Sequence, residues 1–572
     1  MFWVALSIRG GGIDSPRPAS QRAAALVLTA ALLTGAAFPA FAGTYYIEEG
    51  NITISAGTQA GTNKVEQVGK DTVDNDKDTI ITNQKTDTAS SHTVTIDAGN
   101  DKVEVTLDNV NIKADSGSAL TSKGDVTLTL KGDNSLTGGN GSDGHYGSYG
   151  ISSSGSLGGS SIGNSGSLTI TGGEKDSLTA QGGYGSLGGG GISINGAVTI
   201  SGGTVNAASG KGGGGGAGSY GSGITSKSLT VSGGTVNAAG SNGGRLGGQG
   251  GYGIDSGDVT ISGGSTVNAT GGEGGPYDNG GYGIHSSGIV TIYGGTVTAN
   301  GGSGTISGGD GICSSGGVTI SGGSTVTANG GNGSSNNGYG GEGIDSGNGS
   351  VAISGGTVNT AGGNGSTGGS SIRGKDIDLS GSLELTAKAG KGTQSNGKVL
   401  SQNGNELDLN DIKDKLDPGA DITTKDADSK VIQHVSIPRP VEPEEPVIPG
   451  ESSSSSDGGS ATPSAPVSSL PGLTVTDKSG AVISYTSTQS GNTLTVCVGR
   501  FTASLHASLS ALRQLRAEGI DTITFQTILC STTLSVDELL AMGGEDTPVA
   551  LAHSMGTARL TVGGEDHSEL LK

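Results

Sequence analysis

The feature that most constrains this chain is a five-residue phrase that returns about every 30 residues. The phrase begins with Thr-Ile-Thr-Gly-Gly, and its copies start 28 to 33 residues apart. Each copy is followed by Thr-Val-Asn-Ala or a close variant, and most are preceded by a Gly-Ile pair. Self-similarity at a period of a few tens of residues indicates a solenoid. The copies start at Thr169, Thr199, Thr230, Thr260, Thr291, Thr319 and Ala352.

The chemistry of each phrase predicts strands. In the stretch from Val198 to Ser201, apolar residues alternate with hydroxyls, so the two kinds of side chain point to opposite faces. Three short strands per turn with glycine at the corners predict an all-β fold, a right-handed parallel β-helix. A flexible Gly/Ser linker is the alternative, but such linkers carry no β-branched residues at fixed phase. The inward ladder should contain Ile200, Val231, Ile261, Ile292, Ile320 and Ile353.

Composition changes divide the chain into four parts. Residues 1–42 have the form of a signal peptide, with arginines before an apolar run and Ala40-Phe41-Ala42 as the cleavage site. Residues 43–435 form the β-helix, whose first and last turns are irregular as solenoid caps usually are. Residues 436–471 are a Pro/Ser-rich linker, and residues 472–572 are a small α+β domain.

Export and charge limit the classes of partner. The apolar run from Ala23 to Ala37 is shorter than the roughly 18 residues that span a membrane, so no membrane insertion is expected. Removal of residues 1–42 takes away three arginines and one aspartate, and the formal charge goes from −21 to −23. A chain this acidic is not expected to bind nucleic acid. The predicted location is secreted or at the cell surface; the sequence does not predict the oligomeric state.

The C-terminal domain has a different pattern. Its predicted elements include a helix over Leu505 to Glu518 and a short helix opened by the capping box at Ser535. Cys497 and Cys530 could form a disulfide in an exported protein, or both could be thiols. None of its residues suggests a reaction.

Tyrosines in the repeat are the first candidates for ligand binding. Tyr149, Tyr252 and Tyr282 each lie two residues before a repeat isoleucine, and Tyr220 and Tyr339 lie a few residues upstream in their turns. Stacked turns would align them into a partial column, and aromatic faces stack on the apolar faces of sugar rings. The sequence predicts a carbohydrate-binding strip. The alternative is a packing ladder that covers glycine backbone.

Outward asparagines form a second candidate. Asn206, Asn237 and Asn268 hold the same position in successive turns and could lie along an extended glycan. The alternative, which the pattern favours, is a ladder of amides that hydrogen-bond one another and stiffen the solenoid.

Acidic residues form a third candidate. Asp310 and Glu342 take the place of the tyrosines in two turns, while Asp255 and Asp345 follow a Gly-Ile pair. Hard cations bind clustered oxygens, so these four residues are candidate calcium ligands. They do not continue the tandem calcium-binding nonapeptide of β-roll proteins, because Gly257 stands where that motif needs a large apolar residue.

The motifs carry a resemblance to a known family. The stretches Lys102 to Val110 and Asp125 to Leu136, followed by the Thr-Ile-Ser-Gly-Gly-Thr-Val turns, resemble secreted carbohydrate-binding β-helix proteins of clostridia and gut bacteria. That family is similar in shape to pectate lyases. The resemblance covers roughly residues 44–390 and implies binding of acidic plant polysaccharide, with calcium, without cleavage.

Catalysis is not expected from the residues themselves. A polysaccharide lyase needs a basic residue as proton acceptor, yet His285 is the one histidine between residues 169 and 372, and no partner for it is evident. We therefore predict an exported, non-catalytic polysaccharide-binding protein. The alternatives are a structural or adhesive stalk that binds protein at a cell surface and, less favoured, a polysaccharide lyase.

Overall fold

The structure is a computed structural model that describes residues 43–142, 145–153, 166–212, 221–244, 247–438 and most of 473–571. The last part has gaps at 478–482, 484, 491, 499, 501, 518, 528–530, 545–546, 555–556, 564 and 569–570. The predicted signal peptide, nearly all of the predicted linker, Tyr220 and Cys530 lie outside the described residues.

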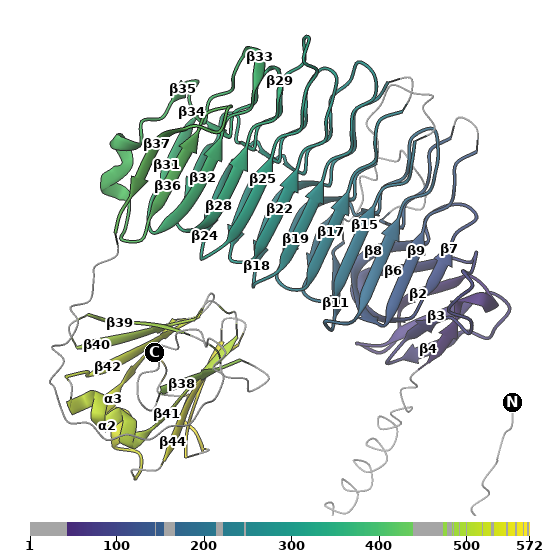
Figure 1. The fold of residues 1–572 in the computed structure, drawn as a ribbon. Coiled ribbons are helices and arrows are strands. Elements are labelled where there is room, and N and C mark those ends of the chain that lie inside the picture. The colour runs from purple at the N-terminus through teal and green to yellow at the C-terminus, as the bar shows by residue number, and fades with distance from the viewer. Residues whose placement is uncertain are drawn as a thin grey trace, which may run out of the picture.

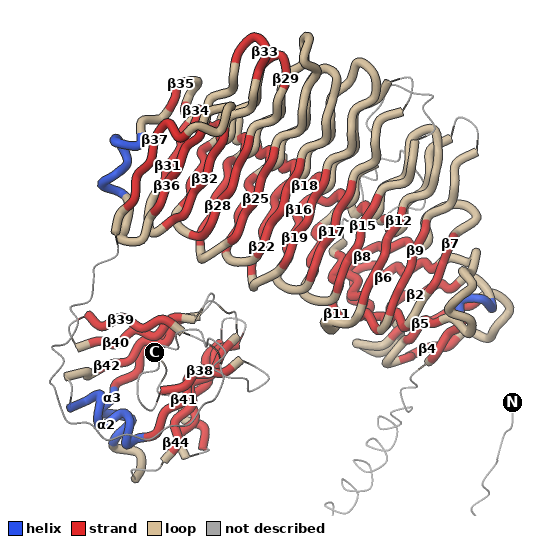
Figure 2. Tube along the Cα trace, viewed as in Figure 1, coloured by secondary structure: helices blue, strands red, loops and turns tan. Residues whose placement is uncertain are grey.

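The described chain is all-β, with a parallel β-solenoid of about 13 turns, which confirms the predicted fold (Figure 1). One turn shows the plan: β20 (Ile284–Ser286), β21 (Ile289–Tyr293) and β22 (Thr296–Asn300) are followed by a glycine-rich loop. In Figure 2 these loops line one long edge of the solenoid, beyond the strands. The three strands per turn are those expected from the repeat.

Strands of successive turns pair in register and form two large sheets. In the 12-stranded sheet, the Thr-Val-Asn-Ala strands align residue by residue, as in the pairing of β15 with β17. Its members are β7 (Asn111–Lys113), β9 (Asp133–Thr137), β12 (Ser177–Gln181), β15 (Thr204–Ala208), β17 (Thr235–Ala239), β19 (Thr266–Thr270), β22, β25 (Thr325–Asn329), β28 (Gly356–Ala361), β32 (Leu383–Lys388), β36 (Asp421–Lys425) and β37 (Val431–Ser436).

The second sheet contains the other two strands of each turn. In four places the two are continuous, in β6 (Val94–Asp108), β8 (Leu120–Lys131), β16 (Ile224–Val231) and β18 (Ile254–Ser262). The short strands are β10 (Ile151–Ser152), β13 (Ile192–Ser193), β20, β23 (Ile312–Ser314), β26 (Ile344–Asp345), β30 (Ile372–Gly374) and β34 (Leu400–Gln402). The strands after them are β11 (Leu168–Gly172), β14 (Ala197–Ile200), β21, β24 (Gly317–Ser321), β27 (Ser350–Ile353) and β31 (Asp376–Leu379).

The core is a stack of aliphatic ladders inside the solenoid. The predicted inward ladder is confirmed, because its six members pair in register from turn to turn and each is fully buried. Burying one such side chain contributes about 1.5–3 kcal/mol. This core needs few aromatic side chains, which account for 3% of the chain.

Irregular elements cap both ends of the solenoid. The polar run after Gly61 is a cap built of strands, because β3 (Asn63–Gln67) pairs antiparallel with both β2 (Ile52–Ala56) and β4 (Val73–Asp76). At the other end β37 pairs antiparallel with β36. The remaining elements are β1 (Thr44–Tyr46), η1 (Ile47–Glu49), β5 (Ile80–Thr82), β29 (Gly365–Thr367), β33 (Gly392–Ser395), β35 (Asn405–Glu406) and η2 (Leu409–Lys415).

The glycine-rich loops of successive turns are joined by a regular array of backbone hydrogen bonds, which local sequence patterns do not predict. The outgoing arm of each loop donates a hydrogen bond to the returning arm of the previous turn, as from Gly302 N to Gly281 O (2.8 Å). The returning arm then donates to its own outgoing arm, as from Gly309 N to Gly302 O (2.8 Å). The same alternation runs unbroken from Gly251 to Gly397. We call this array the glycine wall.

Close approach between the arms explains why the wall contains glycine. A Cβ atom added at Gly302 would lie 1.9 Å from the Gly272 carbonyl oxygen, and one at Gly308 would lie 1.9 Å from the Gly331 carbonyl oxygen. No side chain fits at such distances. The wall therefore accounts for part of the chain's 114 glycines.

The C-terminal part packs two small sheets and two helices around its own core. The predicted helix over 505–518 is wrong in its first turn. Leu505 lies in a strand and pairs with Val475 and Leu551, so the helix begins four residues later. The elements are β38 (Leu473–Thr476), β39 (Thr486–Ser490), β40 (Thr493–Cys497), β41 (Ala503–Ser508), α2 (Leu509–Ala517), β42 (Thr522–Gln526), β43 (Ser531–Ser535), α3 (Val536–Leu540), β44 (Pro548–Ser554), β45 (Thr557–Val562) and β46 (Glu565–Asp566).

Two smaller predictions for this part concern the capping box and the cysteines. The Ser535 hydroxyl accepts a hydrogen bond from Glu538 N, as the capping box predicts. Cys497 is a free thiol in the structure and contacts Gln526, while Cys530, the other half of the disulfide alternative, lies outside the described residues. In the part of the chain that the structure describes, the helices are too short or too polar to cross a lipid bilayer.

Candidate binding groove

Two outward positions in each turn lie at the start of the short strand, where the chain leaves the glycine wall. One is two residues before the inward isoleucine of the short strand, and the other directly follows that isoleucine. The inward position is isoleucine in five consecutive turns and leucine in the next, whereas the outward pair changes from turn to turn. The outward pairs, which we call the variable strip, are Tyr252/Asp255, Tyr282/His285, Asp310/Cys313, Glu342/Asp345, Ser370/Arg373 and Lys398/Ser401.

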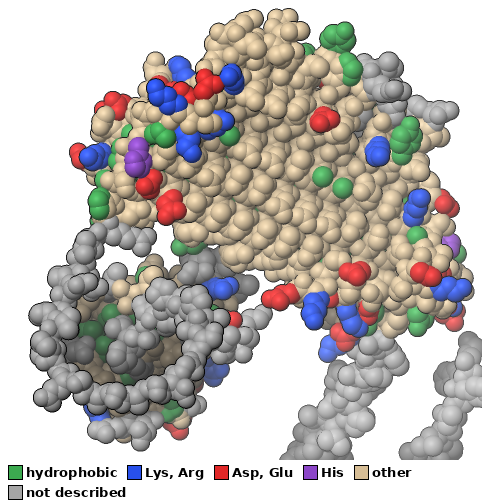
Figure 3. All heavy atoms as spheres, viewed as in Figure 1, with side chains coloured by type: hydrophobic (Ala, Val, Ile, Leu, Met, Phe, Trp, Pro, Cys, Tyr) green, Lys and Arg blue, Asp and Glu red, His purple; other side chains and the backbone are tan. Residues whose placement is uncertain are grey.

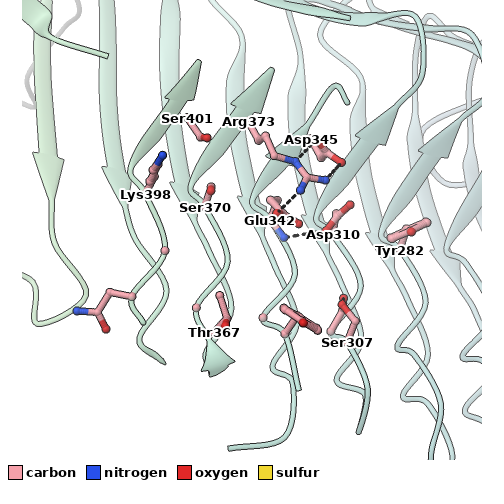
Figure 4. Close-up of a pocket in the computed structure, with 16 residues that line it drawn as sticks. Tyr282, Ser307, Asp310, Glu342, Asp345, Thr367, Ser370, Arg373, Lys398 and Ser401 are labelled. Atoms are coloured by element: carbon pink, nitrogen blue, oxygen red, sulfur yellow. Dashed lines mark hydrogen bonds and ion pairs between the residues drawn. The ribbon is translucent and has the colours of Figure 1, made fainter. Parts of the chain in front are cut away.

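Part of the variable strip forms the floor of an open groove with a volume of about 600 Å³. Figure 4 shows the groove crossing successive turns, with Tyr282 at one end and Lys398 and Ser401 toward the other. The groove is lined by Tyr282, Ser307, Gly308, Asp310, Tyr339, Gly340, Glu342, Asp345, Thr367, Gly368, Ser370, Arg373, Asn396, Gly397, Lys398 and Ser401. It is therefore a polar channel with one side made of glycine backbone.

An aromatic cluster closes one end of the groove. The rings of Tyr252 and Tyr282 stack with centroids 5.0 Å apart and planes inclined by 23°. His285 stacks on Tyr282 at 5.5 Å and contacts Tyr252 at 5.0 Å. The spacing of one turn between the two tyrosines is the expected one. The rings cover one another, as in the packing alternative, and of the three residues Tyr282 lines the groove.

His285 has a partner, contrary to the sequence-based expectation. Its Nδ1 lies 2.8 Å from Asp255 Oδ1 on the preceding turn. The two residues are 30 apart in sequence, but the register of β18 and β20 places them side by side. The histidine is thus held by a carboxylate and two aromatic rings.

Three carboxyl groups and one guanidinium form the middle of the groove. Arg373 Nε lies 2.8 Å from Asp345 Oδ1, and its Nη2 lies 2.5 Å from Asp345 Oδ2. Arg373 Nη1 lies 3.0 Å from Glu342 Oε1. The backbone N–H of Glu342 donates to Asp310 Oδ1 at 2.7 Å, which holds the buried Asp310 beside this pair.

Burial opposes the ionisation of several of these groups. Burial, together with the nearby Glu342 and Asp345 carboxyls, raises the pKa of Asp310 well above its usual value. Burial also raises the pKa of Glu342, although the Arg373 charge opposes that rise. The pKa of the Cys313 thiol is raised by burial and by the nearby Asp310 and Asp345 carboxyls. The surroundings therefore disfavour the ionised forms of Asp310 and Cys313.

The predicted calcium ligands do not come together as one set. Asp310, Glu342 and Asp345 adjoin one another, whereas Asp255 lies two turns away and pairs with His285. Asp310, Cys313 and Asp345 offer ligand atoms within 4.8 Å of one another, a spacing that could hold a metal. As arranged, however, both oxygens of Asp345 already contact the Arg373 guanidinium, so the residues do not fit an open calcium site.

The other predicted tyrosines are distributed unevenly. Tyr339 lies on a loop, is 59% exposed and lines the groove opposite the strip, so it joins Tyr282 there. Tyr149 is half-buried and lies over Gly190 on the next turn, where an added Cβ would be 3.2 Å from its ring. That contact matches the packing alternative for this residue.

The predicted asparagine ladder lies on the 12-stranded sheet and does not line the groove. The Asn237 amide donates to Asn206 at 2.8 Å, and the Asn268 amide donates to Asn237 at 2.8 Å. The amides therefore satisfy one another, as the favoured alternative predicts. In Figure 3, the middle of this side of the solenoid shows few charged side chains.

Sequence reasoning missed the cationic end of the groove. Arg373 and Lys398 belong to turns in which Ser371 and Val399 replace the glycine of the Gly-Ile phrase. The inward residues Ile372 and Leu400 nevertheless keep the register. Aligning the inward apolar positions instead of the glycines would have extended the variable strip by two turns.

Comparison of the chain with protein-family models, with curated proteins and with solved structures found no match. The resemblance to secreted carbohydrate-binding β-helix proteins therefore remains a prediction from the sequence motifs.

Proposed function

We propose that this protein binds an acidic polysaccharide in the groove, without cleaving it. The observation that carries the proposal is the variable strip, in which the repeat changes at the positions that face an open channel while the inward position hardly changes. A repeat protein that needed stability alone would have no reason to vary these positions in particular. An extended ligand is the natural occupant, because the channel runs along the stacked turns.

The lining supports a sugar as the ligand. Tyr282 and Tyr339 offer aromatic surface, and Ser307, Thr367 and Ser370 offer hydroxyls that can donate and accept hydrogen bonds. Turns lie about 4.8 Å apart, so the five turns that line the groove extend about 19 Å, room for about four sugar rings. The exposed side chains of Arg373 and Lys398 favour an anionic sugar at one end.

The setting of the groove is part of the same proposal. The signal-like segment at residues 1–42 supports export, and we place the protein outside the cell or at its surface. A solenoid that carries a binding groove would serve there as an adhesin for polysaccharide. A stalk that contacts protein is the rival, and it requires no glycan binding.

One observation favours a second candidate, a polysaccharide lyase. Asp255 holds His285 by its Nδ1, an arrangement that orients an imidazole for proton abstraction. His285, however, packs against two tyrosine rings and does not line the groove. Release of unsaturated oligosaccharides from an acidic polysaccharide, lost in His285→Ala, would establish this candidate in place of binding alone.

Tyr282→Ala tests the proposal on the full chain. The variant should bind acidic polysaccharide about fivefold to tenfold more weakly, because loss of one aromatic contact costs about 1 kcal/mol. Tyr293→Ala is the matched control, since Tyr293 is 39% exposed and is not among the groove residues. Binding to a glycan array, followed by titration calorimetry, measures the difference.

Two results would contradict the proposal. If the wild-type protein binds none of the neutral and acidic glycans, the result would support the protein-binding stalk. Equal weakening by Tyr282→Ala and Tyr293→Ala would place the binding surface outside the groove.

A further inference from the structure

Arg373 lies against the carboxyl cluster in the middle of the groove. It follows Ile372 on β30, directly beside Asp345 on β26 in the ladder of outward residues. Its guanidinium contacts both oxygens of Asp345 and one oxygen of Glu342. Asp345 and Glu342 therefore already share a cation that belongs to the chain.

A calcium ion could enter this cluster only by undoing its present contacts. Calcium takes six to eight oxygen ligands at about 2.3–2.6 Å. Besides Arg373, Asp345 Oδ1 accepts a hydrogen bond from Gly347 N at 2.8 Å. Asp310 Oδ1 accepts one from Glu342 N at 2.7 Å. The oxygens that calcium would need are thus held by donors, and the thiol of Cys313 lies among them.

The guanidinium also has N–H donors left with which to bind a ligand. Arginine has five N–H donors in a planar fork, and the contacts described above use three of them. The Arg373 side chain is 46% exposed, and it lines the groove. A planar fork of donors matches a carboxylate better than a point charge does. The exposed Lys398 on the next turn adds positive charge on the same side of the channel.

We infer that the Arg373 guanidinium takes the place of a calcium ion in this groove and itself receives the anionic group of the bound sugar. The inference rests on the proposed function for the nature of the ligand, and on the contacts of Arg373 for the absence of a calcium requirement. It makes Arg373 the residue that selects a uronic acid or another anionic sugar over a neutral one.

The first half of the inference is that the groove does not require calcium. It is tested on the full chain with calcium alone, without polysaccharide. The wild-type protein should melt at the same temperature in calcium chloride and in chelator. Arg373→Ser should melt at a higher temperature in calcium chloride than in chelator, because the carboxyls have lost their internal cation. Arg373→Lys keeps a cation and should show no calcium effect, and Lys375→Ser is the control for removal of a nearby exposed lysine.

Either of two results would overturn this half. One is a calcium-induced rise in the wild-type melting temperature that Asp345→Asn abolishes. The other is an Arg373→Ser protein that folds but melts identically in calcium and in chelator. Neither result depends on whether a glycan binds, so this test can be interpreted even if the proposed function is wrong.

Short oligosaccharides of a uronic acid test the second half. Wild-type affinity should be the same in calcium and in chelator, and Arg373→Gln should lower it at least tenfold. Lys375→Ser should change it less than twofold. Binding that disappears in chelator, or that survives Arg373→Gln unchanged, would overturn the assignment of Arg373 as the anion-binding residue.

Discussion

Asp310 is a buried carboxyl in the groove, and its surroundings oppose its ionisation. Its pKa in the folded chain is raised by burial and by acidic neighbours, so the folded state holds a proton that the unfolded state releases. The contribution of this protonated carboxyl to the free energy of unfolding is complete below the pKa of the unfolded state, about 4. It is lost as pH rises through the pKa of the folded state. The slope from this group is at most about 1.4 kcal/mol per pH unit.

Asp310→Asn should remove this slope, because an amide can keep the hydrogen bond from Glu342 N without titrating. We expect the variant to lose less free energy of unfolding than wild type between about pH 5 and about pH 8. Urea unfolding at the two pH values measures the difference. Asp376→Asn, an exposed carboxyl on β31, is the control. An identical slope in wild type and Asp310→Asn would mean that Asp310 is ionised in the folded protein.

The sequence predicted the residue types of the groove better than their partners. Asp310, Glu342 and Asp345 were recognisable because they replace tyrosine or follow the Gly-Ile pair at a fixed place in the repeat. Arg373, the partner of Asp345 and Glu342, was missed because its turn has Ser371 in place of the glycine of the Gly-Ile phrase. The contact forms between residues 28 apart in sequence, through the register of β26 with β30.

At the scale of elements, strands were predictable and loops were not. The alternation of apolar and hydroxyl residues specifies a strand and its inward face, as the buried Ile261 shows. The glycine-rich loops have no such alternation, and their order arises from hydrogen bonds between arms of different turns. Strand β41 shows the same limit, because Leu505 fits the helix period of the leucines in α2 but lies in the strand and pairs with Leu551.

The glycine wall can be tested with a matched pair of substitutions. Gly302→Ala should destabilise the solenoid by about 3 kcal/mol or more, because its Cβ would meet a carbonyl oxygen at 1.9 Å and two arms must separate. Gly264→Ala should cost about 1–2 kcal/mol, since Gly264 has φ +69° but open space around its Cβ. Chemical denaturation of both variants measures the difference. Equal costs would show that the arms do not pack as described.

At the scale of the whole molecule, the stacked turns place equivalent residues of the repeat at regular intervals along the solenoid axis. Each turn adds one outward pair to the variable strip. The side chains therefore follow one another along the groove in the same order as along the chain. The aromatic end at Tyr282, the acidic middle at Asp310 and the cationic end at Lys398 follow one another over five turns. A ligand that uses all of them has to be extended.

The dependence of affinity on ligand length tests this account most directly. Titration calorimetry with uronic acid oligosaccharides of increasing length should show affinity rising up to about four sugars, the length of the groove, and little change beyond. Each added sugar within the groove should contribute about 1 kcal/mol, or about fivefold in affinity. A monosaccharide that binds as tightly as the longest oligosaccharide would contradict an extended groove along the solenoid axis.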